Sequence, residues 1–254
     1  MPFTVSHVAA VVPLRERPGR AGLPLAALAA GSMSPDLPYF MPWLVALGAG
    51  GTLTHSPAGI ATVDLVFGLV MWLVWYLLAP ALRDLMPGFV RARWPAGMPR
   101  RAGVPVLCAA VLVGAITHVV WDAFTHVGRF GHTHIPALAA TYPSPLGPLP
   151  GYRYLQYASG VLGLVVLGVM AARQRPGDAG GRQDPALARF FPWLLAGGVL
   201  LALALRVPAL AQAPEPRTVA FLSITAAGTG LIAATVLAGA LWLFRRHVRT
   251  EASR

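Results

Sequence analysis

Five stretches of the sequence are apolar, almost free of charge and long enough to cross a lipid bilayer as helices. They cover residues 57–79, 104–127, 155–173, 190–212 and 218–244. The hydrocarbon core of a bilayer is about 30 Å thick, and an α-helix needs about 20 apolar residues to cross it. A β-barrel would show short alternating segments instead. Because 56% of the residues are hydrophobic and only 11% are charged, the sequence predicts an all-α, polytopic membrane bundle with about five long transmembrane helices.

Two shorter apolar runs, at residues 3–12 and 22–33, precede the five spans. As helices they would be about 15 and 18 Å long, too short to cross the hydrocarbon alone. We expect an N-terminal short helical hairpin, re-entrant or interfacial, that packs against the bundle. No usual signal peptide precedes it, so we expect the N-terminus to be retained. Residues 1–254 are interpreted as a single integral membrane domain, with motifs in 1–168 and two further transmembrane helices in 186–246.

Arginine is distributed unevenly among the connections between the apolar runs. The net charge is +11, which in a soluble protein would suggest nucleic-acid binding. Here the charges lie between apolar runs, so we expect cytoplasmic loops facing anionic lipid and no nucleic-acid partner. One set of alternate connections holds Arg15, Arg17, Arg20, Arg83, Arg91, Arg93, Arg100, Arg101, Arg173, Arg175, Arg182, Arg189, Arg245, Arg246, Arg249 and Arg254, and the other holds Arg129, Arg153 and Arg217. This bias predicts that the C-terminus is cytoplasmic.

Polar residues suited to metal or proton chemistry gather at one depth, near the predicted outer ends of the runs. Placing an ionised aspartate within the bilayer costs about 2.5–3.5 kcal/mol on the insertion scale, and such residues usually mark function. Imidazole and carboxylate groups are also zinc ligands. The candidate metal ligands are His7, Asp36, His55, His118, Asp122 and His126. Gln156 and Tyr157 begin the third span at the same level and are candidates for substrate contact or ligand support.

The segment THVVWDAFTH, residues 117–126, places three candidate ligands four residues apart on one helix stripe. His118 and His126 would then lie about 12 Å apart, too far to bind one ion. One metal could take His118 and Asp122, and a second could take Asp122 and His126. We therefore expect one or two divalent transition-metal ions. Zinc is favoured because imidazole suits it better than it suits calcium or magnesium.

Asp64 and Arg206 each lie six or seven residues inside the predicted outer end of a span. They could meet as a buried ion pair that sets the helix register. Alternatively, Arg206 could bind a phosphate and Asp64 a metal ion or a proton.

The motifs MPFTVSHVAAVVPL, GSMSPDLPYF, THSPAG and HVVWDAFTH followed by LQYASGVLG resemble a bacterial membrane-protein family known as domain of unknown function 4184. The similarity covers the chain to about residue 168. That family is similar to predicted membrane-bound metal-dependent hydrolases, and the resemblance implies this class of protein.

A more distant similarity is to the all-helical zinc-dependent phospholipases C and single-strand-specific zinc nucleases. It implies one metal held by Asp36, His55, His118 and Asp122. His7 would contact a second metal together with Asp122. Those enzymes have a later His-x-x-x-Glu pair, whose place here is taken by Gln156 and Gly160, and often a histidine where Tyr157 stands. These departures favour one or two metals over three.

We therefore expect a membrane-embedded metal-dependent hydrolase that acts on a lipid-linked ester, with a phosphoester favoured, in the bacterial cytoplasmic membrane. The expected partner is a membrane lipid or lipid-linked small molecule, the site faces the extracytoplasmic side, and Asp36 or Asp122 serves as general base. Two alternatives stay open. An ion or metal transporter would need a polar route to the cytoplasm, and a non-catalytic scaffold would use the metal structurally. The sequence carries no signal for the oligomeric state.

Overall fold

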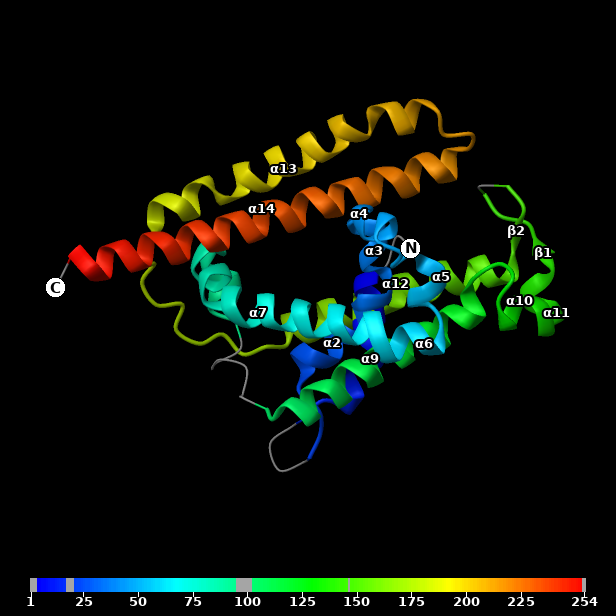
Figure 1. Cartoon of the computed structure of the whole chain (residues 1–254), viewed down its shortest axis with the longest axis horizontal. Helices are drawn as coiled ribbons and strands as arrows, with labels where there is room; N and C mark the ends of the chain where they lie inside the picture. The colour runs from blue at the N-terminus through cyan, green and yellow to red at the C-terminus, as the bar shows by residue number, and fades with distance from the viewer. Residues whose placement is uncertain (1–3, 17–20, 95–101, 146, 253–254) are drawn as a thin grey trace.

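The computed structural model describes residues 4–16, 21–94, 102–145 and 147–252, and this part of the chain is almost entirely helical (Figure 1). The all-α prediction is therefore confirmed. Some of the arginines used for the predicted orientation lie outside the described residues: Arg17, Arg20, Arg100, Arg101 and Arg254.

Five segments are long and apolar enough to cross a membrane: Pro57–Leu85, Val104–His134, Gly151–Ala172, Pro185–Ala211 and Pro216–Glu251. They contain the long helices α7 (Leu65–Leu85), α9 (Val104–Thr125), α12 (Gly151–Ala172), α13 (Pro185–Ala211) and α14 (Pro216–Ala252). This number and length indicate a multi-pass membrane protein. The last helix continues beyond the predicted end at residue 244, because its arginine-rich final turns can stay helical in water.

The remaining elements are short and connect or support the long helices. They are η1 (Thr4–His7), α1 (Val8–Val11), η2 (Val12–Leu14), α2 (Leu25–Met33), η3 (Ser34–Asp36), α3 (Leu37–Phe40), α4 (Trp43–Ala46), α5 (Gly51–Thr54), α6 (Pro57–Gly59), the π-helical turn η4 (Ile60–Asp64), α8 (Gly88–Arg91), α10 (Phe130–His134), α11 (Pro136–Ala139), and the antiparallel strands β1 (Thr141–Tyr142) and β2 (Leu149–Pro150).

The chain reverses direction from one long helix to the next, so its connections gather at two ends (Figure 1). One end holds α8, the connection from α12 to α13, and the C-terminus, and we call it the arginine-rich end. The other end holds α10, α11 and the β1–β2 pair, and we call it the hairpin end. This separation agrees with the alternation of arginine-rich and arginine-poor connections in the sequence.

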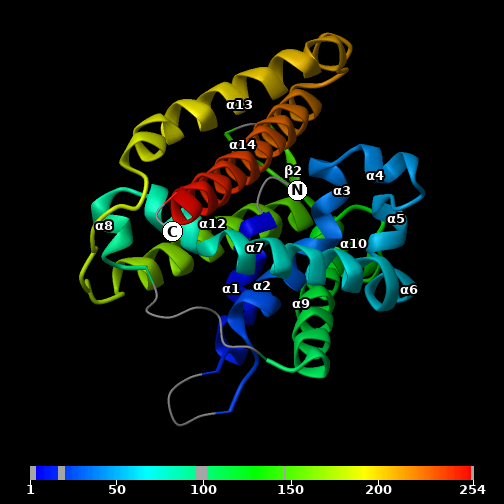
Figure 2. The ribbon, with the colours of Figure 1, turned by 60° about the vertical axis from the view of Figure 1, so that its left-hand side comes forward.

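Helices α13 and α14 form an antiparallel pair along one side of the other helices, as Figure 2 shows from a second direction. At the arginine-rich end, α7, α13 and α14 share an apolar core, and nearer the hairpin end α14 also contacts α3. The largest members of the core are Leu82, Leu85, Phe191 and Trp242, and Trp242 is only 1% exposed. Burial of this core fixes the position of the pair against α7.

The N-terminal hairpin lies among the long helices, and its second arm, α2, packs between α7 and α9. The backbones of α2 and α9 are in direct contact because glycines meet there. A Cβ atom on Gly114 would lie 2.3 Å from the carbonyl oxygen of Leu28, and one on Gly31 would lie 2.1 Å from that of Val111. Small residues permit this kind of close helix approach. The predicted hairpin is confirmed, with its second arm between two long helices.

Candidate metal centre

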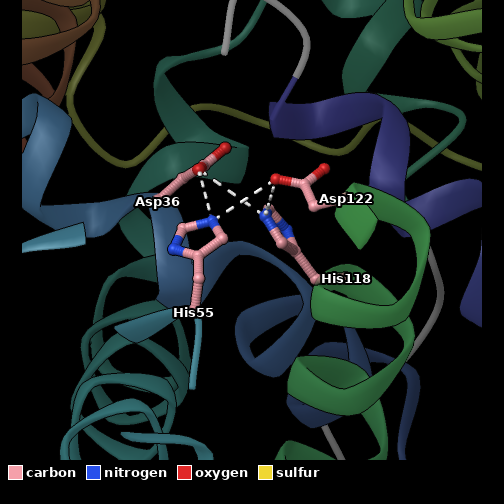
Figure 3. A group of neighbouring side chains, drawn as sticks. All are labelled: Asp36, His55, His118 and Asp122. Carbon is pink, nitrogen blue, oxygen red and sulfur yellow. Dashed lines mark ion pairs between the residues drawn. The ribbon is translucent and has the colours of Figure 1, made fainter. Parts of the chain in front are cut away.

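Four polar side chains from three parts of the chain converge inside the bundle, toward the hairpin end (Figure 3). Asp36 ends the turn η3, which follows α2 and contains Pro35. His55 directly follows α5, and Ser56 then caps the start of the next helical segment. His118 and Asp122 lie one turn apart on α9. Their side chains are at most 5% exposed.

The distances between these groups suit a tetrahedral ion. The Asp36 Oδ1 atom lies 3.6 Å from His55 Nε2 and 3.5 Å from His118 Nε2. The Asp122 Oδ2 atom lies 3.3 Å from His55 Nε2 and 3.4 Å from His118 Nε2. Ligand bonds of about 2.1 Å in a tetrahedron place the ligand atoms about 3.4 Å apart. The four atoms, each within 4.8 Å of the others, therefore leave room for one such ion.

The two histidines are oriented as metal-bound histidines usually are. In each ring, the nitrogen that faces away from the centre is hydrogen-bonded to a backbone carbonyl. His118 Nδ1 lies 2.7 Å from the carbonyl oxygen of Ser32, and His55 Nδ1 lies 3.0 Å from that of Gly51. A carbonyl oxygen only accepts, so each Nδ1 carries the hydrogen and donates. In the neutral ring, which is the form that binds a metal, Nε2 then keeps a lone pair that points into the centre. Such outer hydrogen bonds select the tautomer and orientation of metal-bound histidines.

The atoms that face the centre include several with no other partner. Among the described residues, Asp36 Oδ1, His118 Nε2 and Asp122 Oδ1 are buried and make no hydrogen bond. Buried polar atoms normally have partners, and a bound ion is one explanation for those that do not. The donor set and these orphaned atoms together fit a divalent metal.

Asp36 and His55 of the centre, and His7 beside it, lie outside the spans, and the pKa values of Asp36 and His7 suit cation binding. Burial alone would lower the pKa of His55, but its hydrogen bonds to Asp122 and Asp36 raise it by more. Burial alone would raise the pKa of Asp36, but His118 and His55 lower it by more, so it lies well below the usual range. Burial, followed by repulsion from His118, lowers the pKa of His7 to about 4. At neutral pH Asp36 is therefore a carboxylate and His7 a neutral imidazole, the forms that bind metals.

His7 lies beside the four-residue group and faces the second oxygen of Asp122. Its Nε2 atom is 3.6 Å from Asp122 Oδ1, and its ring stacks on His118 with the centroids 3.9 Å apart. Asp122 thus faces the central group with one oxygen and His7 with the other. This is the arrangement expected of a bridging carboxylate.

His126 does not continue the helix stripe that the sequence suggested. Helix α9 ends at Thr125, and His126 has extended backbone angles two residues before Gly128, whose φ is +72°. The ring folds back, so that Nδ1 lies 3.2 Å from the carbonyl oxygen of Asp122 and 3.5 Å from its Oδ2 atom. On the other side, Nε2 lies 3.0 Å from Gln156 Nε2. His126 adjoins Asp122 but is outside the four-residue group.

The remaining candidates take separate positions. Gln156 is buried against His126, and Tyr157 is half-buried beside it. Asp64 is fully buried, and neither of its carboxyl oxygens has a hydrogen-bond partner among the described residues. It forms no ion pair with Arg206, which is half-buried on α13. The ion-pair alternative is therefore wrong, because the α13–α14 pair contacts α7 mainly at the arginine-rich end, far along the helix from Asp64.

Sequence reasoning missed the groups that support the ligands. Thr4 donates to Asp36 Oδ2 across 2.5 Å, and Thr54 donates to the carbonyl oxygen of Pro35 across 2.8 Å, joining the turns that carry Asp36 and His55. Both residues are close in sequence to predicted ligands, but nothing in the local pattern distinguishes them from other threonines. The carbonyl partners of the two histidines could not be predicted from the sequence for the same reason.

Replacing Thr4 with valine is expected to weaken metal binding about tenfold. The change keeps the shape of the side chain but removes its hydrogen bond to Asp36, and losing such an outer contact typically costs ten- to a hundredfold in metal affinity. Competition against a chromogenic chelator would measure it. Thr133→Val removes an exposed threonine hydroxyl that donates to the backbone carbonyls of Arg129 and Phe130, and it should leave affinity unchanged. Equal affinities for both variants would contradict the role of Thr4.

The fold and the site together define a helical, multi-pass membrane protein with a buried group of two histidines and two aspartates able to hold a metal ion. The family model described as a domain of unknown function (DUF4184) matches residues 1–241, and the chain belongs to this family. The match extends beyond the expected limit near residue 168 and includes α13 and most of α14. No curated protein and no solved structure gives a significant match.

Proposed function

We propose that this protein is a membrane-embedded metal-dependent hydrolase that cleaves a lipid-linked ester, with a phosphoester favoured, at the outer face of the bacterial cytoplasmic membrane. The observation that carries the proposal is the arrangement of Asp36, His55, His118 and Asp122 at ligand spacing with outer hydrogen bonds already in place. Zinc is the favoured ion because two imidazoles and two carboxylates suit it. When bound, zinc supplies a Lewis acid for a phosphoryl oxygen and makes a nearby water molecule more acidic.

Asp122 is the better candidate for general base. Its Oδ1 atom has no hydrogen-bond partner among the described residues, and it faces His7. In Asp36, by contrast, Oδ1 faces the two histidines and Oδ2 already accepts a hydrogen bond from Thr4. Asp122 Oδ1, beside the ring of His7, is therefore the carboxyl oxygen that would take up the proton.

The surroundings of the centre favour a substrate that arrives at the hairpin end. An apolar cluster lies on the other side of His118, toward the arginine-rich end. It includes Leu107 and Val111 of α9 together with Val11 and Leu28. Such a cluster offers no polar route through the bundle, which disfavours the transporter alternative. The side chain of His126 is 30% exposed, so the centre is most accessible from the hairpin end. The arginine bias of the sequence favours an extracytoplasmic position for that end.

Purified full-length protein loaded with zinc is expected to hydrolyse phosphoester lipids, and Asp122→Asn should lower the rate at least about a hundredfold, because a general base contributes about 10²–10⁴-fold. Phosphate release from short-chain phosphatidic acid, and headgroup release from phosphatidylcholine, would be measured in detergent. Asp178→Asn, an exposed change at the arginine-rich end, is the matched control.

A zinc-loaded protein that turns over none of a broad panel of lipid esters would contradict the proposal. If such a protein moved metal ions across liposomes in an Asp122-dependent way, it would be a transporter. If chelation unfolded it and no turnover or flux were found, the metal would be structural.

A further inference from the structure

A second feature adjoins the candidate metal centre: a cavity of about 300 Å³ at the hairpin end. Its walls come from the first turns of α12 and α14, from Tyr39 on α3, and from the chain just after α9. No sequence motif pointed to it, because its walls come from four distant parts of the chain.

The cavity meets the metal centre through two residues. His126 and Gln156 both line it. The ring of His126 also lies 3.5 Å from Asp122 Oδ2, and its far nitrogen lies 3.0 Å from the amide nitrogen of Gln156. A group bound in the cavity is therefore separated from Asp122 by a single imidazole ring.

The charge of the cavity wall is positive. Arg153 and Arg217 line it, and none of its described lining residues is acidic. Neither arginine forms an ion pair with any described residue, and the buried Nε atom of Arg153 has no hydrogen-bond partner among them. By contrast, Arg245 at the other end of the molecule lies 2.7 Å from Asp184. Two guanidinium groups without a carboxylate suit an anion, and phosphate in particular, because phosphate can accept bidentate bonds from arginine.

The helix backbones add to the positive charge of the cavity wall. Arg153 is in the first turn of α12, a helix of 22 residues, and Arg217 is in the first turn of α14, a helix of 37 residues. No side chain caps the first turn of α12. The amino-terminal ends of helices carry partial positive charge and favour anions. Both helices therefore reinforce the two arginines.

Part of the cavity wall is apolar and suits a lipid. Phe221 and Ile224 on α14 line it, and Phe221 packs edge-on against Tyr39 with the ring centroids 5.7 Å apart. A volume of 300 Å³ holds a phosphate headgroup but not acyl chains. Chains could continue along the exposed apolar faces of the same helices, at Val161, Leu162 and Leu231.

We propose that this cavity binds the phosphate group of an anionic lipid, held by Arg153 and Arg217 beside His126. The inference rests on the proposed function, which it deepens by naming the substrate class and the residues that position it. It also moves the phosphate-binding role away from Arg206, which does not line the cavity.

Calorimetric titration of the full-length protein in phosphate-free detergent tests binding apart from turnover. The probes are dihexanoylphosphatidic acid, the matching uncharged diacylglycerol and inorganic phosphate. We expect the phosphatidic acid to bind, the diacylglycerol to bind much more weakly, and Arg153→Gln and Arg217→Gln each to weaken phosphatidic acid binding about tenfold, since a charge-assisted hydrogen bond is lost. Arg189→Gln, an exposed change at the arginine-rich end, removes the same charge and should bind as the unchanged protein does.

The outcomes separate this inference from the proposed function. Binding that depends on both arginines in a protein with no hydrolytic activity would support the site and contradict the hydrolase. Inorganic phosphate binding as tightly as the lipid would support the anion site and identify free phosphate as its ligand. Binding unchanged by both substitutions, no binding of either anion, or binding lost only with Arg206→Gln would overturn the proposal, even if hydrolysis were observed.

Discussion

Replacing His118 with alanine is expected to abolish stoichiometric metal binding and lower zinc affinity about a hundred- to a thousandfold. Four protein ligands share a zinc binding free energy of about 10–16 kcal/mol, so one ligand accounts for about 2.5–4 kcal/mol. His118 is fully buried, and its Nε2 atom faces both Asp36 and Asp122. No neighbouring histidine can replace it, because His7 stacks on its face rather than pointing at the same place. Elemental analysis of detergent-purified protein and chelator competition would measure the effect.

The matched control is His247→Ala. His247 is exposed at the end of α14 and contacts only Glu251 among the described ion-pair partners, so its removal should leave the metal content at the level of the unchanged protein. Size-exclusion profiles and thermal unfolding would establish that the His118 variant is folded. A folded His118 variant that keeps one tightly bound zinc ion would show that the metal centre is elsewhere.

Replacing Asp84 with alanine is expected to destabilise the protein by about 3 kcal/mol or more without altering metal binding. Asp84 lies near the end of α7, and its carboxyl oxygens accept from the Trp242 ring nitrogen at 2.9 Å, the Gln183 backbone at 2.8 Å and the Asp184 backbone at 3.0 Å. These bonds hold α7, α14 and the start of α13 together beside their shared apolar core. Each buried donor left unsatisfied costs about 1–3 kcal/mol.

Thermal unfolding in detergent should show the loss as a midpoint lowered by roughly 5–10 °C. Asp178→Ala removes an exposed carboxyl that bonds only within its own connection, to the backbone of Gly180, and it should change the midpoint little. An Asp84 variant as stable as the Asp178 variant would contradict the proposed role. A loss of zinc in the Asp84 variant at temperatures where it is still folded would show unexpected coupling between the two ends.

The helical architecture could be predicted because the bilayer makes it a local property. Continuous apolar runs of about 20 residues leave a helix as the only way to satisfy the backbone, and all five predicted spans correspond to helical segments in the structure. The short hairpin was predictable for the same reason, since runs near residues 3–12 and 22–33 cannot cross the hydrocarbon alone. Its insertion between α7 and α9 was not, because it depends on contacts between distant glycines.

The candidate site was partly predictable. Orientation placed six candidate ligands at one depth, and the resemblance to zinc-dependent phospholipases grouped Asp36 and His55 with His118 and Asp122, the set that the structure brings together. Helix geometry alone suggested that His126 extends the stripe on α9. That extension fails because the helix ends at Thr125 and the chain turns at Gly128.

The sequence by itself determined which stretches form the long helices and which polar groups gather near their ends, because both follow from local hydrophobicity along a single chain. Only the tertiary structure decided which ring nitrogen of His55 and His118 faces the centre, that Asp64 and Arg206 stay apart, and that Arg153 and Arg217 share a cavity with His126. Those outcomes depend on how helices rotate and pack against one another. That packing is set by contacts between residues far apart in the sequence, such as Thr229 and Phe40. Local sequence patterns do not encode such contacts.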